Sequence, residues 1–124
     1  MKELNLYAGD SPISDAVLEN GILSAVCVPE YEDGTIEQGD IRAQADLTFR
    51  NLAKVLEMAG GSMKDVVQVI VFLCDMSDKA GMNEVWKTYF PDTRPNRATI
   101  GINALGEPGM KIEIAVTAIL DKQE

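Results

Sequence analysis

An arginine and a glutamate, Arg97 and Glu113, are the residues of this sequence best suited to chemistry on a small acid. Arginine binds a carboxylate through two parallel, charge-assisted hydrogen bonds that also fix the plane of the carboxylate. A partly buried glutamate can hold a water molecule and accept its proton. The alternative is structural, because a cross-strand pair of opposite charges is common on solvated sheets and contributes about 0 to 1 kcal/mol without any function.

Both residues fall in stretches whose apolar side chains alternate as they do in β-strands. These stretches are residues 96–103 and 111–120, and the turn residues at 106–109 favour antiparallel pairing between them. If the apolar faces of both strands join one core, Arg97 and Glu113 lie together on the other face of neighbouring strands. A cation and a carboxylate then flank one small patch.

Length and composition indicate a single globular domain over residues 1–124, with 46% hydrophobic residues. The net charge of -9 disfavours nucleic acid and anionic membranes as partners. No apolar run approaches the roughly 18 to 20 residues of a membrane span, and we expect a cytoplasmic protein. Cys27 and Cys74 lie in apolar runs, which is typical of buried thiols. The sequence has no histidine, which is the commonest metal ligand, and we expect no metal site.

The remaining patterns predict two amphipathic helices and further strands. Asp40 is a suitable N-cap for the first helix and Gly60 with Gly61 a suitable C-cap, while Ser77 or Asp78 is expected to cap the second helix. The predicted order is β-β-α-β-α-β-β, an α+β two-layer sandwich with the helices on one face of the sheet. The predicted strands cover residues 2–7, 22–28, 65–74, 96–103 and 111–120, and the first helix covers residues 40–59.

Two of these strands, 22–28 and 65–74, are apolar on both faces. Because two helices cover only one face of a sheet, the other face is expected to meet another subunit. A closed ring of subunits would place Arg97 and Glu113 near the subunit boundaries.

The chain resembles the Rid family, the reactive intermediate deaminases also called the YjgF family, over nearly its whole length. The resemblance rests on the segments AQADLTFRNLAKVLEMAGGSMKDVVQVIVFLCDM, MNEVWKTYFP, RPNRATIGI and GMKIEIAVTAIL. It implies a chorismate-mutase-like fold assembled as a homotrimer with clefts between subunits. Members with the arginine motif hydrolyse 2-imino or enamino acids to 2-oxo acids and ammonia, without a cofactor.

The resemblance also assigns roles to residues. Arg97 matches the carboxylate-binding arginine of the family's P-x-R-[SA]-x motif, and Glu113 matches the water-positioning glutamate of its K-I-E-I motif. Thr99 stands where many members have cysteine, and its backbone would line the cleft. Ile13 replaces the tyrosine of a Pro-Tyr-Ser-x-Ala segment, and Ser24 begins a segment that departs from Ser-Gly-Gln-x-Pro at its next two positions.

Three functions therefore stay open. The first is an imine or enamine deaminase acting on small imino acids. The second is a binding or regulatory protein with weak or no turnover, or a deaminase for a larger substrate such as aminomuconate, either of which the missing tyrosine allows. The third is the nuclease or translation-inhibitor activity attributed to some relatives, against which the net charge of -9 argues.

Overall fold

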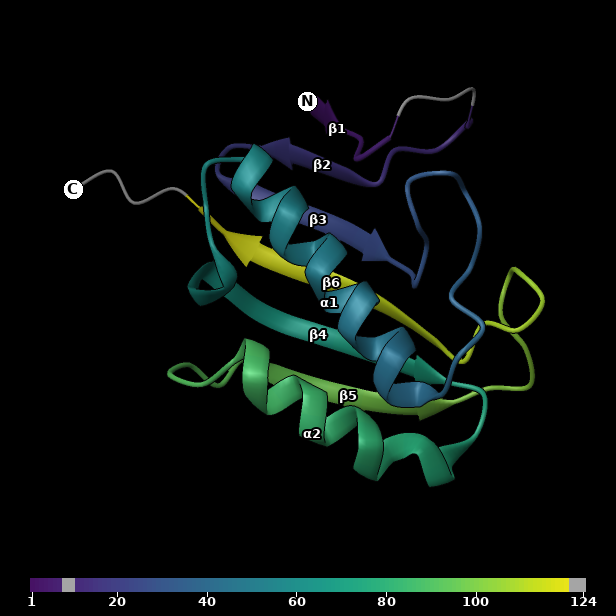
Figure 1. Cartoon of the computed structure of the whole chain (residues 1–124). Coiled ribbons are helices and arrows are strands. Elements are labelled where there is room, and N and C mark those ends of the chain that lie inside the picture. The colour runs from purple at the N-terminus through teal and green to yellow at the C-terminus, as the bar shows by residue number, and fades with distance from the viewer. Residues whose placement is uncertain (8–10, 121–124) are drawn as a thin grey trace.

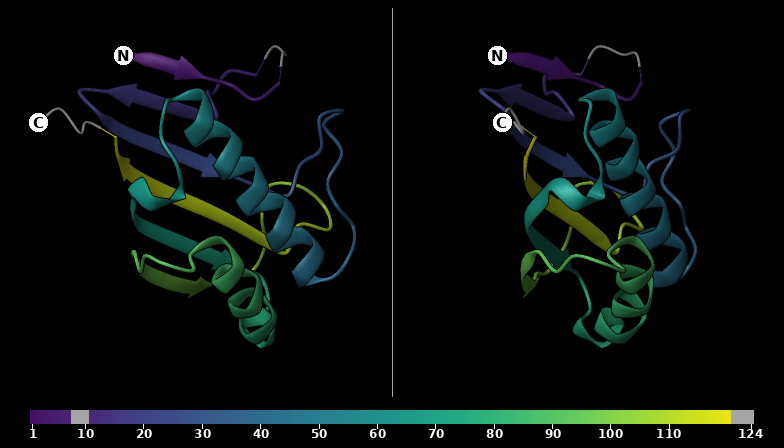
Figure 2. Two further views of the ribbon diagram at one scale, coloured as in Figure 1. Left: turned by 60° about the vertical axis from the view of Figure 1, so that its left-hand side comes forward. Right: turned by 90° about the vertical axis from the view of Figure 1, so that its left-hand side faces the viewer.

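A six-stranded sheet and two helices packed on one of its faces form the two layers of the protein in the computed structural model, which describes residues 1–7 and 11–120 (Figure 1). Side views place both helices on the same side of the sheet (Figure 2). The predicted α+β class and the single helix layer are confirmed. The strands are β1 (Lys2–Leu4), β2 (Ala16–Glu19), β3 (Ile22–Cys27), β4 (Val66–Leu73), β5 (Asn96–Gly101) and β6 (Ile112–Ile119), and the helices are α1 (Ile41–Met58) and α2 (Lys79–Tyr89).

The strand β2 is an addition to the predicted order. The sequence analysis predicted no strand between the first one and residues 22–28, but Ala16–Glu19 pairs with both β1 and β3. The turn between β2 and β3 has positive φ angles at Asn20 (52°) and Gly21 (76°), as a two-residue hairpin turn of type I′ requires. Its sequence, Ala-Val-Leu-Glu, does not alternate apolar with polar residues, which is why this strand escapes the periodicity signal.

The last two strands, β5 and β6, are not neighbours, so the predicted antiparallel pairing between them is wrong. The sheet order is β1-β2-β3-β6-β4-β5, in which β6 is antiparallel to both β3 and β4 while β5 lies parallel to β4 at the edge. Parallel strands need a crossover connection, and α2 supplies it between β4 and β5. The long connection 102–111 then carries the chain back past β4 to the centre of the sheet (Figure 1).

The core lies between the helices and the face of the sheet that they cover. On the neighbouring strands β4 and β6 alternate residues point into it, so Val69 and Val71 of β4 and Ile112 and Ile114 of β6 are fully buried. They pack in one apolar cluster with the inward stripe of α1, which includes Phe49.

Both predicted caps of α1 are confirmed. The Asp40 side chain accepts a hydrogen bond from the backbone N–H of Ala43. At the other end Gly60 has a φ of +87°, and the N–H groups of Gly60 and Gly61 bond back to the carbonyls of Glu57 and Leu56, which is a Schellman motif.

The start of α2 differs from the prediction. A 3₁₀ turn, Met76–Asp78, precedes the helix, and Asp78 makes no side-chain cap hydrogen bond. Instead the Asp75 carboxylate accepts from the backbone N–H of Ser77 at 2.9 Å. The capping carboxylate has moved to the start of the turn, because that turn rather than the α-helix leaves the first free N–H groups.

The sheet face away from the helices, called the open face below, carries apolar side chains that no described part of the chain covers. Ile22 and Val26 of β3, Ile100 of β5 and Ile119 of β6 are 50%, 49%, 41% and 40% exposed. This face explains why the sequences of the central strands are apolar on both sides. Within the described ranges no helix is long and apolar enough to cross a membrane.

Candidate functional site

Arg97 lies on the helix-covered side of the edge strand β5, beneath α2. Its partner on β4 is the fully buried Val69, and paired residues of neighbouring strands point to the same face. Its Nε donates to Oγ1 of Thr99 at 3.0 Å, its Nη1 lies 3.7 Å from the sulfur of Met82, and its Cζ lies 4.8 Å from the centroid of the Trp86 ring. The guanidinium is therefore held between β5 and α2.

The charge of Arg97 has no carboxylate partner in the described part of the chain. None of the salt bridges found among residues 1–7 and 11–120 includes it. Burial lowers the pKa of Arg97, because desolvation disfavours the charged form, although an arginine stays protonated near neutral pH. A half-buried cation without a counter-charge among the described residues is suited to binding an anion.

Glu113 lies near the start of β6 and faces the other way. It stands between the fully buried Ile112 and Ile114 and pairs with Phe72 of β4, so its carboxylate is on the open face. The side chain is half-buried, and the resulting desolvation raises its pKa. A carboxylate whose pKa is raised accepts a proton more readily, which suits a general base.

The sequence predicted Arg97 and Glu113 on one face of neighbouring strands. This prediction is wrong, because the two residues lie on opposite faces of the sheet and their strands are not neighbours. The strand β4 separates β5 from β6, so the two strands are roughly 10 Å apart. Arg97 lies on the opposite face from Glu113 because α2 covers the side of β5 that bears Arg97 and Thr99. The apolar residues of β5, including the exposed Ile100, lie on the open face.

Among the other candidates, the structure brings only Thr99 to Arg97, through the hydrogen bond given above. Ser24 is an exposed residue on the open face of β3, opposite Thr117 of β6. Ile13 precedes β2 and is 75% exposed. Two strands, β6 and β4, lie between Ser24 and the edge strand of Arg97. One chain therefore carries Arg97 and Thr99 beneath α2, whereas Glu113 and Ser24 lie on the open face.

The positions of Trp86 and Met82 beside Arg97 were not predicted from the sequence. The aromatic and apolar residues of α2 have helical spacing, which by itself indicates a core stripe. The sequence does contain one signal that these two residues act together, because Met82 and Trp86 are four residues apart and so share a helix face. The parallel crossover then places this face over β5.

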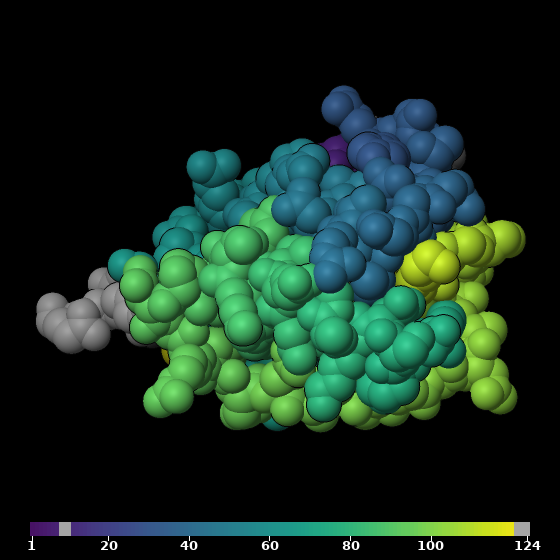
Figure 3. Space-filling view, turned by 60° about the horizontal axis from the view of Figure 1, so that its bottom comes forward, coloured from purple at the N-terminus to yellow at the C-terminus, as the bar shows by residue number. Residues whose placement is uncertain are grey.

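A buried glutamine of α1, Gln44, fixes the segment that leads to Glu113. Its amide Nε2 donates to the carbonyl of Gly109 and its Oε1 accepts from the N–H of Lys111, both at 2.8 Å. Figure 3 shows the chain around residues 105–110 in yellow-green beside the blue segment that begins α1 and the green helix α2. Gln44 therefore holds the end of the long connection and the start of β6 against α1.

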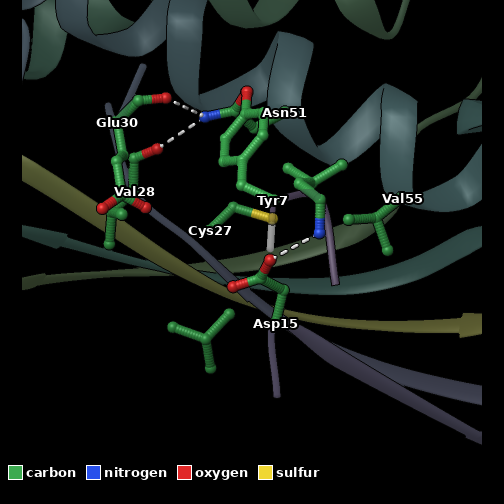
Figure 4. A pocket seen from close by; sticks show the side chains of 9 residues that line it. Tyr7, Asp15, Cys27, Val28, Glu30, Asn51 and Val55 are labelled. Atoms are coloured by element: carbon green, nitrogen blue, oxygen red, sulfur yellow. Dashed lines mark hydrogen bonds between the residues drawn. The ribbon is translucent and has the colours of Figure 1, made fainter. Parts of the chain in front are cut away.

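A small cavity lies at the end of β3, and hydrogen bonds beside it hold the residues that follow this strand (Figure 4). The amide of Asn51 donates to the carbonyls of Val28 and Glu30 at 3.0 and 2.9 Å. The buried Cys27 also lines the cavity, and burial raises its pKa to about 12, so the thiol is not a nucleophile near neutral pH. Within the described ranges no group of three His, Cys, Asp or Glu side chains is arranged to hold a metal.

Comparison with known proteins identifies the class to which this fold and these residues belong. Residues 8–120 match the family model described as "Endoribonuclease L-PSP". The chain belongs to this family, the YjgF or Rid family, and the resemblance found in the sequence is confirmed.

Individual relatives agree with this assignment. The mitochondrial protein mmf2 of Schizosaccharomyces pombe is 40% identical over 109 residues, which is 86% of each chain. The crystal structure of RidA from an Antarctic Psychrobacter species has a TM-score of 0.83 and 30% identity, covering 91% of this chain and 92% of that one. The structure of Escherichia coli TdcF with bound serine has a TM-score of 0.87 and 26% identity, covering 96% and 98%. Because mmf2 is named as mitochondrial, a cytoplasmic location stays a prediction for this chain.

Proposed function

We propose that this chain is an enamine/imine deaminase that hydrolyses 2-imino or 2-enamino acids to 2-oxo acids and ammonia. The observation that carries the proposal is Arg97, a half-buried guanidinium without a carboxylate partner among the described residues. The serine in the TdcF structure supports it, because serine carries the carboxylate that an imino acid also has.

The proposed first step is binding of the substrate carboxylate by Arg97. The Nη1 and Nη2 groups can donate two hydrogen bonds to the carboxylate. Nε already donates to the Thr99 hydroxyl, and the Met82 sulfur near Nη1 is only a weak acceptor. The imine carbon is bonded to the carboxylate carbon, so fixing the plane of the carboxylate also orients the electrophile.

The proposed second step is attack by water held at Glu113. The glutamate accepts a proton as the water oxygen bonds to the imine carbon, and the nitrogen takes up the electron pair of the C=N bond. With the imine protonated at the start, this step gives a neutral amino group beside the new hydroxyl group. Glu113 then returns its proton to the nitrogen, the C–N bond breaks so that ammonia leaves with the electron pair, and Glu113 accepts the hydroxyl proton as the C=O bond forms. The raised pKa of Glu113 suits these transfers, and a positioned base of this kind contributes about 10² to 10⁴ in rate.

Both residues can reach one small substrate only if they come from different copies of the chain. An imino acid spans a few bonds, whereas Arg97 and Glu113 lie on opposite faces of the sheet with β4 between their strands. We therefore propose a homotrimer in which Arg97 and Thr99 of one copy face Glu113 of the next. The apolar open face supports self-association, because a monomer would leave it in water.

The exposed Ile13 favours one alternative. It has no hydroxyl group where the family's motif has tyrosine, so a protein that binds carboxylates with weak turnover, or a deaminase for a larger substrate such as aminomuconate, is the second candidate. Cleavage of RNA, which the name of the family model suggests, is disfavoured by the net charge of -9.

The test is hydrolysis of freshly generated 2-iminopropanoate and 2-iminobutanoate, measured against their spontaneous decay. The wild type is expected to accelerate the loss of both imines, and Arg97→Ala is expected to abolish the acceleration. Absence of acceleration by the wild type, with binding of 2-oxo acids retained, would support the second candidate.

A further inference from the structure

We propose that Trp86 is a positioning residue for Arg97, holding the guanidinium where it meets the substrate carboxylate. The inference rests on the proposed function, in which Arg97 binds that carboxylate. Its basis is the 4.8 Å between Cζ of Arg97 and the ring centroid of Trp86, within the range of a cation–π interaction.

Arg97 needs such support because of where it lies. It stands on an edge strand, and a long arginine side chain has many rotamers. No salt bridge in the described part of the chain orients it. The hydroxyl of Thr99 accepts from Nε, and the Met82 sulfur, 3.7 Å from Nη1, is only a weak acceptor, so the ring is the main group that places the outer end of the guanidinium. A ring attracts the cation as a whole and, unlike a carboxylate, leaves the N–H groups of the fork free for a ligand.

Trp86 is itself held firmly. Its ring centroid lies 4.4 Å from that of Phe90 and 5.8 Å from that of Phe49, which meets it edge to face. Phe49 is fully buried in the core, so the platform is anchored to α1 as well as to α2. A rigid platform reduces the conformational freedom that Arg97 loses when it binds a ligand, which is how preorganisation raises affinity.

The experiment compares three variants by calorimetric titration with 2-oxobutanoate and by imine hydrolysis. Trp86→Leu removes the ring, and its affinity is expected to fall about 5- to 30-fold, with KM raised by a similar factor and kcat within about threefold. Trp86→Phe keeps an aromatic face and is expected to stay within about threefold of wild type. Val85→Ala is the matched control, because it trims a partly buried neighbour on the same helix that is not among the hydrogen-bond or ring partners of Arg97.

Fluorescence gives a second measurement that does not need the leucine variant to fold. Trp86 is the single tryptophan of the chain, so its emission reports the contact directly. The emission is expected to differ between wild type and Arg97→Ala. In wild type it is expected to change on titration with 2-oxobutanoate, and the midpoint of this change should fall at the same ligand concentration as the midpoint measured by calorimetry.

The outcomes separate the two proposals. If Arg97→Ala binds 2-oxobutanoate as the wild type does, the proposed function fails whatever Trp86 does. If Arg97→Ala loses binding but Trp86→Leu keeps it, or Val85→Ala loses as much as Trp86→Leu, the positioning role of Trp86 is overturned and the proposed function stands. Emission that responds neither to Arg97→Ala nor to saturating ligand also overturns it.

Discussion

Arg97 and Glu113 project from opposite faces of one sheet, with β4 between their strands. The buried Val69 pairs with Arg97, and Phe72 pairs with Glu113 on the open face. A single chain therefore cannot present both groups to one small acid. If both act on the same substrate, the site is shared between copies, and this sharing has a quantitative consequence.

The two single variants should complement each other. Arg97→Ala and Glu113→Gln are each expected to be nearly inactive in imine hydrolysis. When equal amounts are unfolded and refolded together, about a quarter of wild-type activity should return, because random assortment into trimers gives every mixed trimer one cleft with both native residues.

Native mass spectrometry of the refolded sample supplies the control by showing that mixed trimers form. Adding the Arg97→Ala/Glu113→Gln double variant to Arg97→Ala should restore nothing. Mixed trimers without recovered activity would mean that both residues act from the same copy.

Glu113 should lower stability once it is ionised. Burial raises its folded-state pKa above the unfolded value, so the folded protein binds the proton more tightly. The destabilisation is absent below the unfolded pKa, grows as the pH rises through the window between the two values, and is complete above the folded pKa. Glu113→Gln is therefore expected to be more stable than wild type near pH 8 and to lose this advantage near pH 4, as urea unfolding at a series of pH values can measure. An advantage that grows toward low pH would contradict this account.

Gln44 should be costly to replace. Gln44→Leu leaves the Gly109 carbonyl and the Lys111 N–H without partners beside a buried side chain, and we expect a loss of about 2 to 4 kcal/mol in the free energy of unfolding. Gln38→Ala is the control, because that exposed side chain makes only long hydrogen bonds, to the carbonyls of Ile36 at 3.3 Å and Pro108 at 3.4 Å, and its cost should be within about 0.5 kcal/mol. Equal costs for the two variants would show that the buried bonds to Gly109 and Lys111 carry no special weight.

Cys27 should resist alkylation in the native protein. With its pKa raised to about 12 and its side chain buried, it is neither ionised nor accessible at pH 8. Peptide mass spectrometry after iodoacetamide treatment should find Cys27 modified only when urea is present. The partly exposed Cys74 gives an internal comparison in the same sample. Labelling of Cys27 at the rate of a free thiol would mean that the end of β3 opens readily.

What the sequence predicted correctly depends on local signals. The caps at Asp40 and Gly60 need only neighbouring residues. The surplus of apolar residues in β3 and β4 likewise predicted an uncovered face, which the structure has.

What the sequence did not predict depends on partners far along the chain. Alternation shows that Arg97 and Glu113 lie in strands, but it does not show which strands are adjacent or which face of an edge strand a helix covers. The crossover through α2 decides both, and it also brings Trp86 to Arg97. The candidate residues were therefore accessible to sequence reasoning, whereas their grouping required the topology.

The central place of β6 also affects how the protein is made. It joins β3 on one side to β4 on the other, although its residues, Ile112–Ile119, leave the ribosome after all the other strands. Until then β3 and β4 lack the strand that joins them, and the strand edges that β6 covers in the finished sheet are unpaired. The sheet can therefore be completed only after β6 has been synthesised. A ribosome that stalls before this strand leaves a product that cannot complete its sheet, and we expect chaperones and proteases to act on that product.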